Sequence, residues 1–79
     1  PMQGAQRLAA FLRRKSQQGL LSIDDPELAA AQFIDLCQST LVRPRLFNAD
    51  RFAPSTQDIR RVVASAVAMF MARYAQQQV

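Results

Sequence analysis

The chain has no histidine, no tryptophan and a single cysteine, Cys37, in 79 residues. Without histidine or a second cysteine it cannot form an internal disulfide, a His/Cys zinc site or a Ser-His-Asp catalytic group. We therefore expect a protein that is not an enzyme and that uses neither a metal nor a cofactor. Cys37 follows Phe33 and Ile34 and precedes Leu41, so we expect its thiol to be buried and unreactive.

Long uncharged runs are also missing. The longest one on the last apolar segment extends only from Val62 to Ala72, whereas a membrane-spanning helix needs roughly 20 apolar residues. The first residues do not have the cationic and apolar regions of a secretory signal. We therefore expect a soluble protein that does not contact a membrane, and the lone thiol favours the reducing cytoplasm.

The composition that remains is that of a globular domain. Hydrophobic residues make up 49% of the chain and charged residues 20%, which predicts a packed core rather than a disordered segment. At this length there is room for one domain, which buries only about 60% of the surface that its unfolded chain exposes, so its margin of stability should be thin.

The balance of charge is positive. Ten Lys and Arg against six Asp and Glu give a net charge of +4, which raises the possibility of nucleic-acid binding. Its basic clusters are short, and no recognition motif accompanies them, so we favour solvated helix surfaces. The clusters are Arg13-Arg14-Lys15, Arg43 with Arg45, and Arg60-Arg61.

The spacing of apolar residues is helical throughout and does not alternate as in strands. It predicts an all-α fold with three helices, at about 5–18, 26–43 or 26–47, and 56–76. Gly19 can adopt the left-handed conformation that ends the first helix. Pro44 removes a backbone hydrogen bond, so the second helix must end or kink there, and this leaves its two possible ends open.

Two start signals compete at the second helix. Asp25 is the better N-cap, because Pro26 would then be the first helical residue, where a missing N–H costs nothing. The alternative is a capping box of Asp24 with Glu27. The apolar side chains beyond this start cover a wide arc, which predicts contact with two neighbouring helices. Four members of the arc could line a small-molecule pocket or equally form ordinary core: Phe33, Leu36, Cys37 and Thr40.

The third helix has the clearest start, with Ser55 as N-cap and Asp58 reaching back as in a capping box. Its side chains are apolar nearly all round, including alanines such as Ala68 on the side opposite the main face. Such a helix belongs in an interior. Three helices cannot enclose it, so we expect a second copy of the chain to supply the missing wall. The expected dimer interface consists of Ile59, Val62, Val63, Ala66, Val67 and Phe70, supported by Ile34 and Leu41.

Two segments of the sequence also carry a family resemblance. The first runs from Gly19 through Asp25-Pro26-Glu27 and the following alanines to Phe33. After a long helix and a loop, the second runs from Pro54-Ser55-Thr56 through Ile59-Arg60-Arg61-Val62-Val63 to Phe70 and Tyr74. This order resembles the C-terminal region of a tetracycline-repressor (TetR) family regulator, of the AefR-like or AcrR-like branch. The resemblance covers essentially the whole chain.

The resemblance implies an all-helical homodimer whose last two long helices form a four-helix bundle with those of the second copy. It implies that residues 1–79 are one regulatory and dimerisation domain of a transcriptional repressor, which senses a small, often apolar effector. It further implies that the N-terminal helix-turn-helix domain is absent from this chain, so that DNA would be contacted only through that missing domain. The alternative interpretation is a stand-alone basic helical module that binds nucleic acid or another protein.

Overall fold

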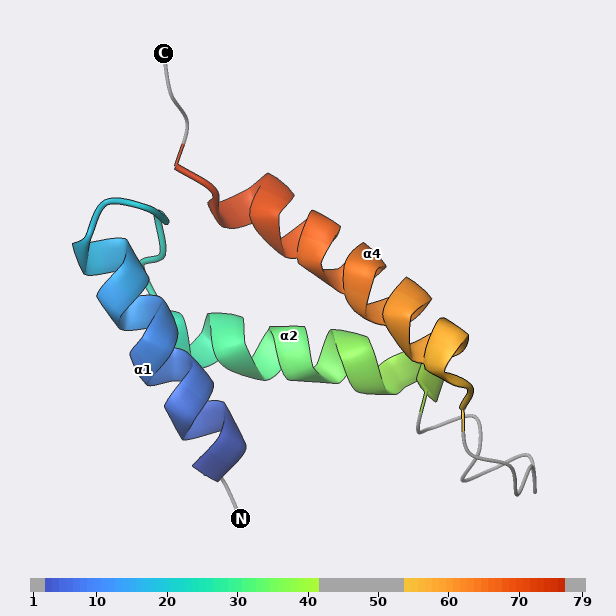
Figure 1. Cartoon of the computed structure of the whole chain (residues 1–79). Helices are drawn as coiled ribbons and strands as arrows, with labels where there is room; N and C mark the ends of the chain where they lie inside the picture. Colours follow the sequence, from blue (N-terminus) through green and yellow to red (C-terminus); the bar gives the residue numbers. More distant parts are fainter. Residues whose placement is uncertain (1–2, 42–53, 77–79) are drawn as a thin grey trace.

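The computed structural model describes residues 3–41 and 54–76, with Thr40 described by its backbone alone. These residues form three helices, α1 (Gln3–Gln17), α2 (Pro26–Leu41) and α4 (Thr56–Tyr74). Figure 1 shows α1 crossing the first part of α2, and α4 beginning near the end of α2. Within the described ranges there is no strand, so the predicted all-α class is confirmed.

The end of α1 is closed by Gly19, as its sequence position predicts. Gly19 has φ +79°, a left-handed conformation that side chains with a Cβ rarely adopt. Its N–H donates to the carbonyl of Ser16 at 3.0 Å, and the N–H of Leu20 donates to the carbonyl of Lys15 at 3.0 Å. These two bonds satisfy carbonyls that the helix end would otherwise leave unpaired.

The start of α2 uses the first of the two signals. The Asp25 carboxylate accepts a hydrogen bond from the backbone N–H of Leu28 at 3.1 Å, and Pro26 is the first helical residue. Asp25 is therefore the N-cap, and the capping box of Asp24 is not the one used. The predicted helix ends at 43 or 47 and the effect of Pro44 lie outside the described residues, as does the connector expected from Arg43 to Pro54, except for Pro54 itself.

The start of α4 is the predicted capping box. The Ser55 hydroxyl accepts from the N–H of Asp58 at 3.0 Å, and the Asp58 carboxylate accepts from the N–H of Ser55 at 3.4 Å. Two backbone donors at the helix start are satisfied in this way. The cap explains why the helix begins at the predicted residue.

The end of α4 is tied to the linker between α1 and α2. Ala75 is extended and forms an isolated antiparallel bridge with Leu21. The Ser22 N–H donates to the carbonyl of Tyr74 at 2.8 Å, and the Gln76 N–H donates to that of Leu20 at 3.4 Å. This pairing ends the helix two residues before the predicted limit of 76, because the backbone leaves the helical conformation to reach the linker.

The core lies where α1, the linker and the first part of α2 meet. It consists of Ala9, Leu12, Leu21, Ile23, Ala29 and Ala30, with Leu8, Phe70 and Tyr74 packed against it. The small alanines let the α1 and α2 backbones approach closely. Because α2 packs against both α1 and α4, its wide apolar arc serves two neighbours, as predicted.

Candidate functional site

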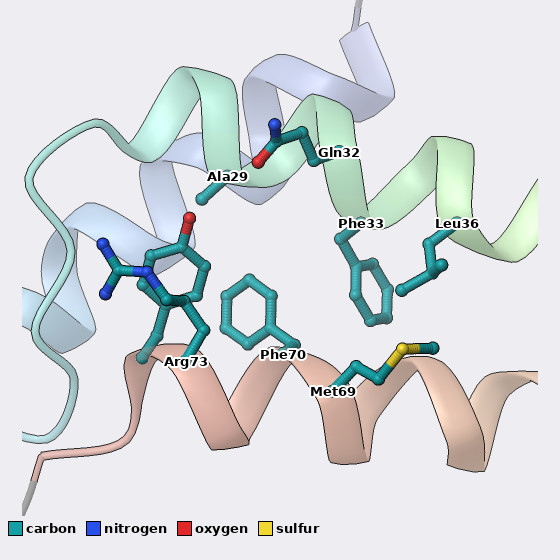
Figure 2. A pocket seen from close by; sticks show the side chains of 8 residues that line it. Ala29, Gln32, Phe33, Leu36, Met69, Phe70 and Arg73 are labelled. Atoms are coloured by element: carbon teal, nitrogen blue, oxygen red, sulfur yellow. The ribbon is translucent and has the colours of Figure 1, made fainter.

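A groove of about 290 Å³ lies between α2 and α4 (Figure 2). Both helices contribute to it because their side chains at a spacing of three and four residues point toward one another across the groove. From α2 the lining residues are Ala29, Gln32, Phe33 and Leu36, and from α4 they are Met69, Phe70, Arg73 and Tyr74.

Aromatic rings form the wall of this groove. The Phe33 and Phe70 rings meet edge to face, with centroids 5.6 Å apart and planes at 85°. Phe70 also contacts Tyr74, at 4.8 Å between centroids. These distances are typical of favourable aromatic pairs, which hold each other's orientation. The wall therefore consists of three rings in contact, contributed by two helices.

Arg73 supplies a positive charge to the same groove. Its guanidinium carbon lies over the Tyr74 ring, 4.9 Å from the centroid, a distance at which a cation is attracted to an aromatic face. Gln32 lies on the opposite helix, across the groove from α4 (Figure 2). The groove thus combines apolar walls with a cation and an amide.

The groove continues along the helices into a second hollow of about 250 Å³. The two hollows share Leu36 and Met69, and the second adds Arg61 and Ser65 among its lining residues. No carboxylate lines either hollow in the part of the chain that the structure describes. Asp35 lies in a shallower depression beside them. The floor of the combined groove is therefore apolar, and its charged lining residues are arginines.

A third hollow, of about 140 Å³, lies between α1, α2 and α4. Its lining residues are Leu8, Leu12, Phe33, Val67 and Phe70, and all of them present hydrocarbon. Phe33 and Phe70 line both this hollow and the groove. The two rings therefore separate the two hollows from each other.

The residues predicted for a pocket are only partly brought together. Phe33 and Leu36 line the groove. Cys37 is half-buried rather than buried and is not among the groove's lining residues. Burial raises the pKa of its thiol, which disfavours the reactive thiolate at neutral pH. The side chain of Thr40 lies outside the described residues.

The residues predicted for a dimer interface fall into two groups. Ile59, Val63 and Val67 are exposed, at 41%, 37% and 43%. Ala66 is buried within the single chain, and Phe70 and Val62 are half-buried. On α2, the predicted supporting residues Ile34 and Leu41 are half-buried as well. The periodic face of α4 is therefore divided between contact with α2 and open surface.

The basic clusters are dispersed over the surface. Arg13 forms an exposed ion pair with Glu27, and its hydrogen bond lowers the pKa of the Glu27 carboxyl. Lys15 lies over the Phe11 ring, 5.3 Å from the centroid. Arg60 and Arg61 are exposed on α4. Arg43 and Arg45 lie outside the described residues.

Sequence reasoning did not select five of the groove residues: Ala29, Gln32, Met69, Arg73 and Tyr74. The spacing of Met69, Phe70, Arg73 and Tyr74 at three and four residues places them on one side of α4, and this signal was present in the sequence. What the spacing does not show is that α2 lies opposite this side, since that depends on how the two helices cross.

The described residues contain neither a metal-binding cluster nor a membrane-spanning helix. Within 3–41 and 54–76, no three His, Cys, Asp or Glu side chains are grouped so that they could hold a metal ion. None of the three described helices is both long and apolar enough to span a bilayer.

Comparison with known proteins places this arrangement in a family. Residues 1–76 match the family described as AefR-like transcriptional repressor, C-terminal domain. The chain belongs to the TetR family of transcriptional regulators. The resemblance in the sequence is thereby confirmed, and the TetR-family match covers both α2 and α4 and hence the whole groove.

Solved structures agree with the family assignment. The chain is similar to a TetR family transcriptional regulator from Pseudomonas syringae pv. tomato str. DC3000, with a TM-score of 0.79 and 30% identity over 92% of this chain. It is also similar to a flavonoid-responsive regulator, FrrA, with a TM-score of 0.79 and 26% identity over 94% of this chain. No curated protein matches the sequence significantly.

The TetR-family chain spans only part of those two proteins. It covers 38% of the first and 37% of the second. What the three helices share with these regulators is therefore the C-terminal domain of the family, as the matched family description states.

Proposed function

We propose that this chain is the dimerisation and effector-sensing domain of a TetR-family transcriptional repressor, and that it acts by binding rather than by catalysis. In the intact regulator a separate helix-turn-helix domain would read DNA, in the cytoplasm. The family match supports the regulatory role. The observation that carries the dimerisation role is the exposed apolar surface of α4.

That surface consists of Ile59, Val63, Val67 and Met71, each more than a third exposed in the single chain. Burying such side chains against a second copy would contribute roughly 25 cal/mol for every Å² of apolar area removed from water. A core in a chain this short supplies only about 3–5 kcal/mol, so pairing with a second copy would add to the stability of the fold.

Effector sensing is supported by the groove between α2 and α4. Its aromatic wall and its few polar groups are the usual composition of a small-molecule site. The groove and the exposed surface of α4 lie on different sides of that helix, because Val63 and Val67 are not among the groove's lining residues. One helix can therefore contact an effector and a second copy at the same time.

The test of dimerisation is the mass of the chain in solution, measured by light scattering across micromolar concentrations. We expect a dimer for the parent chain and a monomer for Val67→Glu, because the substitution would bury an unpaired charge in the interface. Ala68→Glu is the matched control. Ala68 is exposed on the same helix, but as the residue after Val67 its side chain points about 100° away around the helix axis.

Two outcomes would contradict the assignment. A monomeric parent chain at all concentrations would remove the dimerisation role. A monomer for Ala68→Glu together with a dimer for Val67→Glu would move the interface to the alanine side of α4. Circular dichroism of each variant shows whether the three helices are retained.

A further inference from the structure

We propose that the groove between α2 and α4 binds an amphipathic organic acid, whose carboxylate pairs with Arg73 and whose single apolar ring or branched chain lies against Phe33, Phe70 and Met69. This inference rests on the effector-sensing role proposed above and specifies the chemical class of ligand.

The charge of the groove selects an anion. Arg73 forms no ion pair with any carboxylate in the described ranges, and no Asp or Glu lines its hollow. Arg61 lines the adjoining hollow, again without an acidic lining residue. An arginine can hold a carboxylate with two parallel hydrogen bonds, which is the strongest form of this pairing.

The surroundings of Arg73 favour an organic acid over an inorganic anion. Its guanidinium lies over the Tyr74 ring, and Tyr74 contacts Phe70, which contacts Phe33 in turn. A ligand seated on Arg73 would therefore continue onto hydrocarbon, which offers an apolar group contacts that an inorganic ion cannot use.

The size of the groove limits the ligand. A volume of about 290 Å³ is at the lower end of the range for small-molecule sites, which is roughly 300–1,000 Å³. The hollow accommodates one ring with a short acidic side chain. We therefore choose 3-phenylpropionate as the probe and its uncharged amide, 3-phenylpropanamide, as the matched ligand.

The methionines provide the readout. Met69 lines the groove, whereas Met71 is on the same helix and is not among the lining residues of either hollow of the groove. In the chain labelled with ¹³C at its methionine methyl groups, we expect 3-phenylpropionate to shift the Met69 resonance and leave that of Met71 unchanged. The phenyl ring of the ligand, seated beside Met69, would shift the methyl resonance through its own ring current.

Substitution of Arg73 separates charge recognition from apolar contact. We expect Arg73→Gln to weaken binding of the acid by about tenfold or more, because a hydrogen bond to a charged group is lost, and to leave binding of the amide unchanged. Arg73→Lys keeps the charge without the paired donors and should retain part of the affinity. Arg60→Gln is the control, since Arg60 is exposed and outside the groove.

Specific results would overturn the proposal. Equal affinity for acid and amide, an equal loss in Arg60→Gln, or equal shifts at both methionines would each do so. Absence of any shift at Met69 would also overturn the proposal. If, in addition, the Met69→Glu variant were monomeric where the parent chain is a dimer, a second copy of the chain would be the occupant of the groove. A dimeric parent chain without acid binding refutes this inference alone, whereas acid binding by a monomer refutes the dimerisation role alone.

Discussion

The two ends of the three-helix fold differ in how completely their apolar side chains are buried. At the end formed by α1, the linker and the start of α2, six residues are buried in one cluster, and the linker is hydrogen-bonded to the end of α4. At the other end, α4 begins with Ile59 and Val63 exposed. Among the described residues, the chain therefore completes one core at the first end and leaves apolar side chains of α4 exposed at the second.

The enclosed end depends on small residues and on one turn. Ala9, Ala29 and Ala30 are almost fully buried, and they allow the helices to come close. Gly19 turns the chain so that Leu21 and Ile23 can cover the same cluster. The open end has larger side chains, but no third element lies over them among the described residues.

The largest effect is expected at the enclosed end, from Leu12→Ala. Leu12 is 3% exposed, so the truncation leaves a cavity and should lower the free energy of unfolding by about 2–4 kcal/mol. Leu20→Ala is the matched control, since Leu20 is 59% exposed. Urea unfolding, followed by circular dichroism at one fixed protein concentration, gives the free energies of unfolding of the two variants. Equal losses would show that the core is not where the structure places it.

An intermediate effect is expected at the open end, from Ser55→Ala. Removing the hydroxyl leaves the N–H of Asp58 without its partner, which should cost about 1 kcal/mol. Thr56→Ala next to it removes a similar hydroxyl from the first helical residue. Hydrogen exchange should become faster in the first turn of α4 for the Ser55 variant and remain near the parent rate for the Thr56 variant. The reverse order would mean that the cap does not hold this end.

The smallest effect is expected for Glu27→Gln, at the surface of the enclosed end. The hydrogen bond from Arg13 lowers the pKa of Glu27 in the folded chain, so its contribution is present above the unfolded pKa and is lost as the pH falls through the lowered folded value. Both side chains are exposed, and salt should weaken the contribution further.

The measurement for Glu27 is thermal unfolding of the parent, both single variants and the Glu27→Gln, Arg13→Gln double variant at neutral and acidic pH. The coupling between the two positions should be small at neutral pH and vanish in acid or at high salt. A coupling that persists in acid would assign the effect to packing of the side chains instead of their charge.

Local signals in the sequence predicted the helices and most of their limits. Ser55 with Asp58, and Gly19, act through bonds to backbone groups within a few residues, so the sequence alone carries enough information about them. Asp25 is the preferred N-cap over Asp24 because Pro26 follows it, and its bond to the N–H of Leu28 confirms that preference. The bridge between Leu21 and Ala75 had no local signal, because it joins segments that only folding brings together.

The candidate site was predicted less completely than the helices. The apolar arc of the second helix predicts Phe33 and Leu36 as pocket residues, whereas nothing local in the sequence distinguishes Arg73 from a solvated arginine. Its place beside Tyr74 and opposite Gln32 follows from the way α2 and α4 pack. In the same way, periodicity grouped Val62, Ala66 and Phe70 with Ile59, Val63 and Val67, and packing against α2 separated them.

The sequence by itself determined the all-α class, the capped helix starts, the family and the presence of more apolar surface than three helices can bury. These follow from spacing and from contacts between neighbours in the chain. Only the tertiary structure decided which side of α4 packs within the chain, which side remains open and which residues form the groove. The physical reason is that a helical pattern specifies a direction around one axis, whereas burial depends on the position of a second helix.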